Sequence, residues 1–169
     1  MKLIIVVFFI YAHLFAYEKE SKVICALTAK MAKFTQKNNS NINPYTITIL
    51  HNQFGNLFAE LFRNIKIYDK NVQVIYIDDI DELQTSNILF IFDTAPQELD
   101  KILRDIEGKH ILTMSTMRGF AQRGGMIQIY AKNQKLKLKI NLDNVKKEGI
   151  YINSALLRIV HIIRGNDND

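Results

Sequence analysis

GFAQRGGMI at residues 119–127 and KLKLKINL at residues 135–142 decide the fold of the last third of this chain. Residues 136–142 of the second stretch place four aliphatic side chains on one face and two lysines and an asparagine on the other, which is the pattern of a half-buried strand. Residues 127–130 alternate in the same way. Asn133, between the two runs, tolerates the left-handed conformation of a short loop. We therefore expect an antiparallel hairpin here.

A helix with one buried face is expected to close the chain after Gly149. Asn153 or Ser154 can cap its first turn. Apolar residues then recur at helical spacing, namely Leu156, Leu157, Val160 and Ile163. The opposite side of this predicted helix would carry a basic stripe, made by Arg158, His161 and Arg164.

Strand-like and helix-like segments alternate through the rest of the chain. Apolar residues follow helical spacing over 23–34, 54–62 and 99–106, with a short helix over 79–83. Strands are expected over 46–50, 72–77, 87–92 and 109–115. This alternation requires crossover connections. We therefore predict an α/β, Rossmann-like fold: a mostly parallel sheet flanked by helices, with a C-terminal antiparallel hairpin at its edge and a final helix.

The first residues have the composition of an export signal. Residues 3–15 are almost wholly apolar, follow Lys2, and precede the small Ala16 and a charged stretch. We predict a signal peptide over 1–16 and a single exported domain over 17–169. An uncleaved anchor is the alternative, but the apolar run is shorter than the roughly 20 residues that span a membrane.

The chain is basic, with 22 Lys and Arg against 17 Asp and Glu and a formal net charge of +5. Nucleic acid is not expected as a partner, because an exported chain rarely meets it and the lysines are scattered over several elements. The positive charge is compatible with an anionic membrane surface or an acidic partner domain as the binding partner.

Redox, metal and cofactor sites find little support. Cys25 is the single cysteine, so no intramolecular disulfide can form, and its small neighbours on a helix predict an inert buried thiol. The four histidines are isolated from one another. The acidic run from Asp78 to Glu82 lacks the spacing of a calcium loop, and a helix start explains it more simply.

The loop from Ser115 to Gly125 is the candidate binding site. Parallel sheets bind ligands beyond the carboxyl ends of their strands, where His51, Asp78, Asp79 and Asp93 would also lie. Five residues of the loop suit an anion or a partner: Arg118, Phe120, Arg123, Gly124 and Gly125. The alternative is structural, with the glycines shaping a turn and the phenylalanine filling the core.

Enzyme chemistry is not expected. Gly119 and Gly124 have the spacing of a phosphate-binding loop, but Gly125 and Met126 follow where such a loop needs Lys and Ser or Thr. The chain also has no Gly-x-Ser-x-Gly elbow. A nucleoside triphosphatase is therefore excluded, and hydrolase chemistry is unsupported.

The order of these motifs resembles the YfiR-like family of small periplasmic proteins. The likeness rests on Gly-Phe-x-x-x-Gly-Gly-Met-Ile at 119–127, the hairpin, Ile-Asn-Leu at 140–142, a short helix, Gly149, and residues 152–157. It is strongest over residues 111–157 and extends to 29–35 and 88–92. Two departures stand out: Asn87 lies where many relatives have a cysteine, and no Trp-Pro follows the first helix.

The resemblance implies a non-enzymatic regulator. YfiR-like proteins bind the periplasmic sensor domain of an inner-membrane diguanylate cyclase and restrain cyclic-di-GMP synthesis, which affects biofilm formation and surface attachment. The candidate contact surfaces are the hairpin, the Gly-Gly loop and the basic stripe of Arg158, His161 and Arg164. The alternative is a periplasmic module that holds a small anionic ligand and reports to another membrane receptor. A homodimer also stays open.

Overall fold

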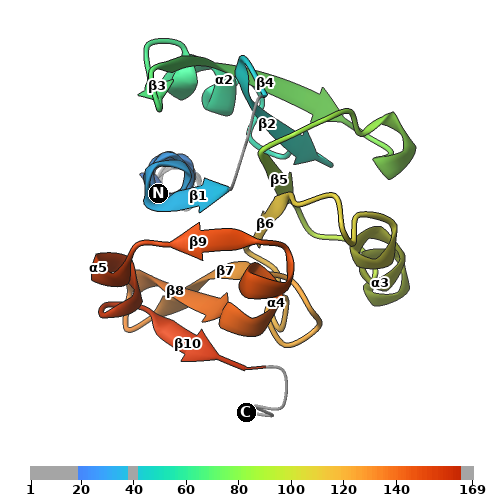
Figure 1. The fold of residues 1–169 in the computed structure, drawn as a ribbon, viewed down its shortest axis with the longest axis vertical. Coiled ribbons are helices and arrows are strands. Elements are labelled where there is room, and N and C mark those ends of the chain that lie inside the picture. The colour runs from blue at the N-terminus through green and yellow to red at the C-terminus, as the bar shows by residue number, and fades with distance from the viewer. Residues whose placement is uncertain (1–18, 38–41, 165–169) are drawn as a thin grey trace, which may run out of the picture.

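The computed structural model describes residues 19–37 and 42–164 of the chain. Eight strands form one curled sheet: β2 (Tyr45–Leu50), β3 (Lys66–Ile67), β4 (Lys70–Ile77), β5 (Ile88–Ile91), β6 (Leu112–Ser115), β7 (Ile127–Lys132), β8 (Lys135–Asn141) and β10 (His161–Ile163). Their order in the sheet is β10-β8-β7-β6-β5-β2-β4-β3 (Figure 1). The predicted signal peptide and part of the expected polar linker lie outside the described residues.

The centre of the sheet is parallel, as the alternating pattern predicts. Strand β2 pairs in parallel with β4 and β5, β5 with β6, and β6 with β7. Every residue of β2, β5 and β6 is buried. Continuous burial of this kind arises when helices cover both faces of a parallel sheet. The α/β prediction is confirmed.

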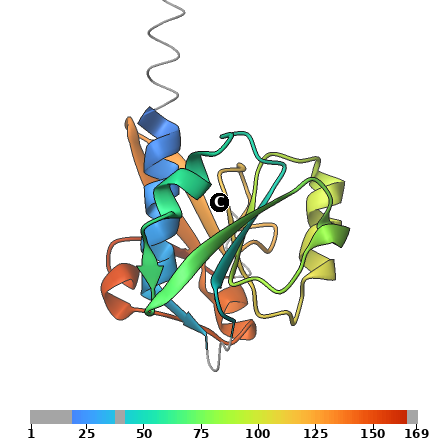
Figure 2. The same ribbon diagram turned by 90° about the horizontal axis from the view of Figure 1, so that it is seen from above.

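Two apolar layers sandwich these strands. A helix over residues 19–34 and α2 (Leu57–Phe62) cover the concave face, where Met31, Phe58 and Phe90 are fully buried. On the other face α3 (Pro96–Asp105) packs through Leu99 and Ile102. Figure 2 shows the N-terminal helix and α3 on opposite sides of the sheet. Short η1 (Ile80–Glu82) lies between β4 and β5.

The predicted hairpin is present, but the C-terminal layout is not the expected one. Strands β7 and β8 are antiparallel, and both residues of their turn have positive φ, 52° at Asn133 and 58° at Gln134. The final helix is a single turn, α5 (Ser154–Leu157), and β10 then pairs in parallel with β8. The hairpin is therefore not the edge of the sheet.

The error at the C-terminus has a physical cause. Residues 159–163 are mostly β-branched, which favours a strand, and β8 has an edge that needs a partner. Val160 and Ile163 satisfy helical spacing but do not belong to a helix. Arg158 at the end of α5, His161 in β10 and Arg164 beyond it consequently form no helical stripe, and that prediction was wrong.

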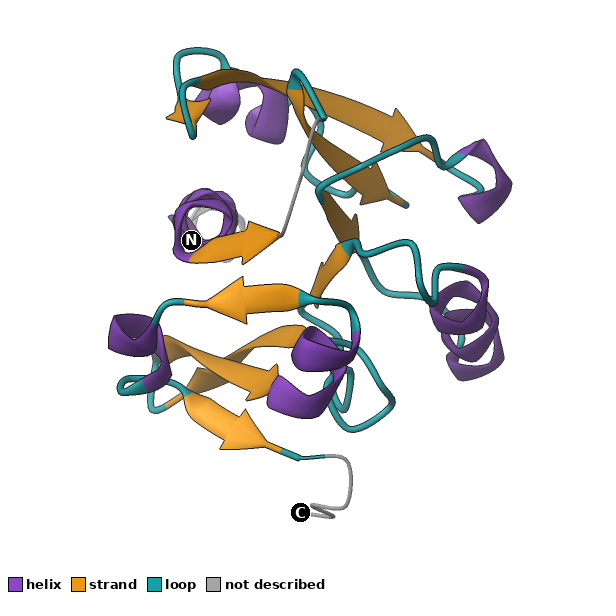
Figure 3. Cartoon of the chain, in the orientation of Figure 1, coloured by secondary structure: helices purple, strands orange, loops and turns teal. Residues whose placement is uncertain are grey.

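A second, two-stranded sheet ties the N-terminal helix to the C-terminal region. Strand β1 (Thr35–Lys37) is antiparallel to β9 (Ile150–Ile152), which follows the helix α4 (Leu142–Lys147). The two strands lie side by side in Figure 3. The backbone N–H of Asn153 also donates to the carbonyl of Phe34, at 2.9 Å. No helix in the described residues is long and apolar enough to cross a membrane.

Candidate functional site

The glycine-rich loop, residues 116–126, is the crossover that joins the parallel strands β6 and β7. It contains turns rather than a regular helix, and Phe120 from it is fully buried among the residues of α3. A Cβ atom at Gly125 would lie 2.2 Å from Cε1 of that ring. Phe120 therefore fills the core instead of offering a stacking surface, and Gly125 leaves room for it.

Two asparagines hold this crossover against the hairpin and α4. Asn141 Nδ2 donates to the carbonyl of Ala121 at 2.9 Å, and Asn144 Nδ2 donates to the carbonyl of Gly124 at 2.7 Å. Gly124 has a φ of +106°, a conformation that favours glycine. These two hydrogen bonds fasten the crossover to the end of β8 and to α4.

Arg123 lines a charged hollow that Arg118 does not line. Arg123 Nη1 lies 3.1 Å from Oδ1 of Asp100 on α3, and both side chains are more than 40% exposed. Arg123 lines a hollow of about 380 Å³ between α3 and α4, and Arg118 is exposed and does not line it. The predicted convergence of the two guanidinium groups is absent from this hollow.

The charges that line this hollow balance. Three acidic and three basic residues line it, namely Asp100, Glu107 and Glu148, and Arg104, Arg123 and Lys147. Arg123 pairs with Asp100, and Lys147 forms an ion pair with Glu107. The hollow therefore offers no excess charge of either sign to a ligand.

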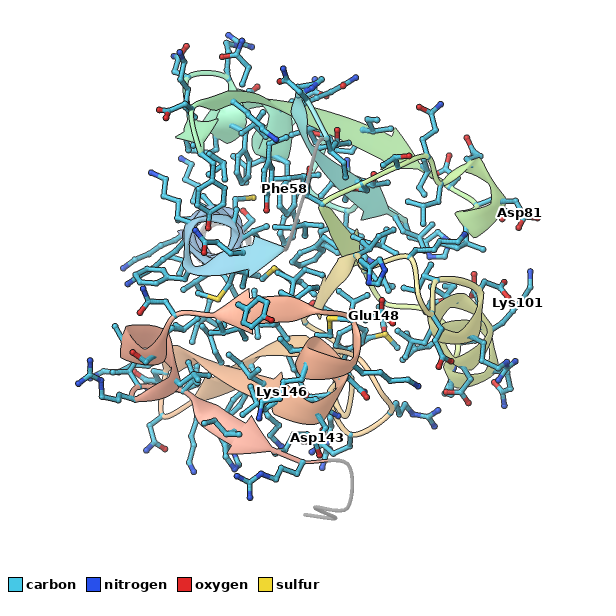
Figure 4. The ribbon with its side chains drawn as sticks, in the orientation of Figure 1. Phe58, Asp81, Lys101, Asp143, Lys146 and Glu148 are labelled. Atoms are coloured by element: carbon cyan, nitrogen blue, oxygen red, sulfur yellow. The ribbon has the colours of Figure 1, made fainter. Side chains whose placement is uncertain are left out.

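Glu148, at the end of α4, is the buried carboxylate of this region. Its Oε1 accepts a hydrogen bond from the backbone N–H of Gly108, and Oε2 accepts one from that of His110, each at 2.8 Å. Figure 4 shows Glu148 inside the molecule, whereas Lys101 points outward from α3. Glu148 fastens the turn before β6 onto α4, a structural role that sequence spacing did not reveal.

The carboxyl ends of the parallel strands form one rim, as predicted. Nε2 of His51, after β2, lies 3.6 Å from Oε1 of Glu98 on α3. Asp79 caps η1 by accepting from the N–H of Asp81 at 2.9 Å, which confirms the simpler explanation of the acidic run. A hollow of about 190 Å³ lies at this rim, lined by Phe54, Phe92 and residues within 20–24 of the N-terminal helix.

The hairpin and β10 together form a larger hollow of about 740 Å³, which we call the hairpin groove. Its lining residues are Tyr130, Lys132, Asn133, Lys135, Lys137, Leu138, Ile159, Val160 and His161. Register places Tyr130 opposite Lys137 and Lys132 opposite Lys135, all on one face of the sheet. None of the described lining residues is acidic. Of the predicted contact residues, only His161 lines this groove.

Cys25 is a fully buried free thiol, as predicted. Burial raises the pKa of this thiol from 9.0 to about 12, because the thiolate would lose its hydration. In the part of the chain that the structure describes, no three His, Cys, Asp or Glu side chains are grouped to hold a metal ion.

Asn87, which differs from the pattern of the resembling family, has a structural role in this chain. It is buried at the start of β5, and its Oδ1 accepts from the backbone N–H of Thr46 at 2.8 Å. Its own N–H donates to the carbonyl of Thr46 at 2.9 Å. The side chain therefore joins β5 to β2 by a hydrogen bond.

Comparisons with solved structures show the fold. An ABC domain in complex with L-Trp from Streptococcus pneumoniae matches with a TM-score of 0.53 and 11% identity, over 80% of this chain and 60% of that one. A conserved domain protein from Vibrio cholerae O1 biovar El Tor matches with a TM-score of 0.52 and 11% identity, over 82% of this chain and 59% of that one. The chain thus spans about 60% of the length of each.

A family comparison is more specific. No curated protein sequence matches significantly. The model of the YfiR/HmsC-like family matches residues 21–161, which takes in every strand and helix from α2 to α5 and the loop with Phe120 and Gly125. The chain therefore belongs to the YfiR/HmsC-like family.

Proposed function

We propose that this chain is a periplasmic, non-enzymatic regulator of an inner-membrane diguanylate cyclase. It binds the periplasmic sensor domain of the cyclase and restrains cyclic-di-GMP synthesis, and so affects biofilm formation and surface attachment. Membership of the YfiR/HmsC-like family carries the proposal, since the match covers residues 21–161. The predicted signal peptide over residues 1–16 supports export.

A regulator of this kind needs a binding surface and no chemistry of its own. Binding the inactive conformation of the cyclase more tightly than the active one shifts the population toward the inactive state. A shift from 99:1 to 1:99 requires about a 10⁴-fold difference in affinity.

The small-anion alternative has less support. It requires Arg118 and Arg123 to grip one ligand, but the guanidinium of Arg123 contacts Asp100. The hollow beside Arg123 has balanced charges, and the hollow at the carboxyl rim is small and partly aromatic. Thermal-shift screening against nucleotides, amino acids and carboxylates separates the two functions, because a ligand stabilises the folded state by mass action.

A pulldown tests the proposal directly. The purified chain is immobilised and offered the periplasmic domain of a membrane diguanylate cyclase from the same organism, with the periplasmic domain of an unrelated receptor as the control. We expect the cyclase domain to be retained and the control domain to pass through. Equal recovery of both domains, or of neither, would count against the proposal.

A further inference from the structure

The hairpin groove carries an excess of positive charge that its own neighbours do not neutralise. Lys132, Lys135 and Lys137 line it and form no ion pair within the described residues, and all three are exposed. His161 lies on the same face, because it is aligned with Lys139 in the pairing of β10 and β8. The hollow between α3 and α4, by contrast, pairs its charges internally.

The arrangement of these lysines is unfavourable for the hairpin itself. Lys132 and Lys135 are directly opposite each other across the β7–β8 turn. Like charges in this position destabilise a hairpin. A hairpin with only a structural role gains nothing from this pair, whereas a surface that binds an anionic partner does.

The spacing of the cations indicates the shape of that partner. Lys135 and Lys137 are two residues apart on β8, so their side chains emerge on one face at a separation of roughly 6.6–6.8 Å. An extended peptide presents alternate side chains at the same spacing. Carboxylates at alternate positions of an extended segment can therefore meet both lysines at once.

An exposed apolar residue at the side of the groove adds a second requirement for the segment that binds there. Ile159, just before β10, is 72% exposed, the largest exposed fraction among the large hydrophobic side chains of the described residues. Tyr130 lines the same groove and is partly buried. The fitting occupant is thus acidic with an apolar residue beside the carboxylates.

Other occupants fit this surface less well. Two copies of the chain that met groove to groove in a symmetric dimer would bring lysines against lysines. A flat bilayer surface does not enter a hollow of about 740 Å³. An extended protein segment meets the shape, the charge and the spacing together.

We infer that the hairpin groove is the docking surface for an extended acidic segment of the partner protein. The inference rests on the proposed function and adds where the partner is held. Lys135 and Lys137 pair with carboxylates at alternate positions, and Ile159 contacts an apolar side chain on the same face of the segment, two residues beyond the carboxylates. Attraction between exposed charges makes this docking sensitive to salt, since the Debye length falls from about 10 Å at 0.1 M to about 3 Å at 1 M.

Fluorescence anisotropy with a synthetic peptide tests the groove on its own. The probe is a labelled peptide with Glu, Glu and Val at successive alternate positions and Ser between them, and its matched control has the same composition with the Glu residues next to each other. We expect the alternating peptide to bind more tightly, and Lys135→Glu/Lys137→Glu to weaken it about tenfold or more. Lys66→Glu/Lys109→Glu, which changes the charge equally at exposed lysines elsewhere, should stay within about twofold of the wild type.

Equal binding of the two peptides, or equal loss in the two double variants, overturns the inference. Vesicles containing phosphatidylglycerol form a further arm. If they bind through the two groove lysines while the peptide does not, the surface recognises lipid and the inference fails. Circular dichroism of every variant confirms that it is folded.

The same variants with the periplasmic domain of the cyclase separate this inference from the proposed function. Retention of that domain by the wild type and the control variant, with loss in the groove variant, supports both. Equal retention by all three keeps the proposed function and overturns the groove as the docking surface. If the wild type itself retains nothing, the proposed function fails, and the peptide measurement alone decides the groove.

Discussion

Replacing Gly125 by alanine should destabilise the protein through one identifiable clash. The new Cβ would lie 2.2, 2.3 and 2.4 Å from Cε1, Cδ1 and Cζ of Phe120. Carbon atoms in contact ordinarily lie about 3.5–4.0 Å apart, so the ring would have to retreat by roughly 1.3 Å. It cannot do so freely, because Phe120 is fully buried against α3.

Overpacking of a core costs about 1–3 kcal/mol, and we expect Gly125→Ala to lie near 3 kcal/mol because three ring atoms are affected together. Gly119→Ala is the matched control in the same loop. A Cβ there meets nothing within 4 Å, but φ is +76°, so only the left-handed backbone is penalised, by about 1–2 kcal/mol. Urea unfolding followed by circular dichroism gives both free energies.

Phe120→Leu supplies the decisive comparison, because it removes the ring atoms that the new methyl group would meet. We expect Phe120→Leu/Gly125→Ala to be more stable than the sum of the two single effects, by about 1–2 kcal/mol. If the two effects are additive, or if Gly125→Ala costs no more than Gly119→Ala, the packing explanation of the Gly-Gly motif is refuted.

Three further predictions follow from single side chains. Glu148→Ala should lower the free energy of unfolding by about 2–3 kcal/mol and release the amides of Gly108 and His110 to hydrogen exchange, because both lose a charged acceptor. The control variant Glu107→Ala, at an exposed ion pair, should lower it by at most about 1 kcal/mol. Because the pKa of the Cys25 thiol is raised in the folded state, the thiol of the unfolded state ionises first as pH rises. The stabilisation is therefore retained below pH 9.0 and lost as pH rises toward about 12. The difference in unfolding free energy between wild type and Cys25→Ala should shrink over that window, and a constant difference would contradict the burial effect. Lys135→Glu should leave the hairpin as stable or stabilise it by about 0.2–1 kcal/mol, since it replaces a like-charge pair with Lys132 by an opposite-charge pair; a clear loss of stability in thermal unfolding would argue against the register.

The sequence predicts well the elements that have a strong local signal. The apolar run 87–92 is buried in β5, Pro96 begins α3, and the loop at Asn133 forms the expected turn. In each case the local pattern and the tertiary packing favour the same structure.

It fails where short segments depend on distant partners. Strands β1, β9 and β10 have three residues each, and each forms only because a strand far away in sequence lies beside it. The spacing of Leu156, Leu157, Val160 and Ile163 fits a helix equally well. Pairing with the open edge of β8 decides for the strand.

The candidate site was likewise predictable only where a local sequence pattern determines the structure. A phenylalanine and two glycines in an irregular loop suit either a binding loop or a packed turn, and only the position of the Phe120 ring against Gly125 distinguishes them. The directions of Arg118 and Arg123 likewise depend on backbone turns that spacing does not fix. The lysines of the hairpin groove, in contrast, follow from the alternation and from the register that the turn imposes.

Cyclic-di-GMP in living cells tests the central claim most directly. The nucleotide is quantified in a strain that carries the cyclase recovered in the pulldown, with the gene for this chain intact, deleted, or restored as the wild type or as Lys135→Glu/Lys137→Glu. The account predicts that deletion raises cyclic-di-GMP and that the wild-type gene lowers it again, while the groove variant does not. An unchanged cyclic-di-GMP level on deletion, with the cyclase present and active, would contradict it.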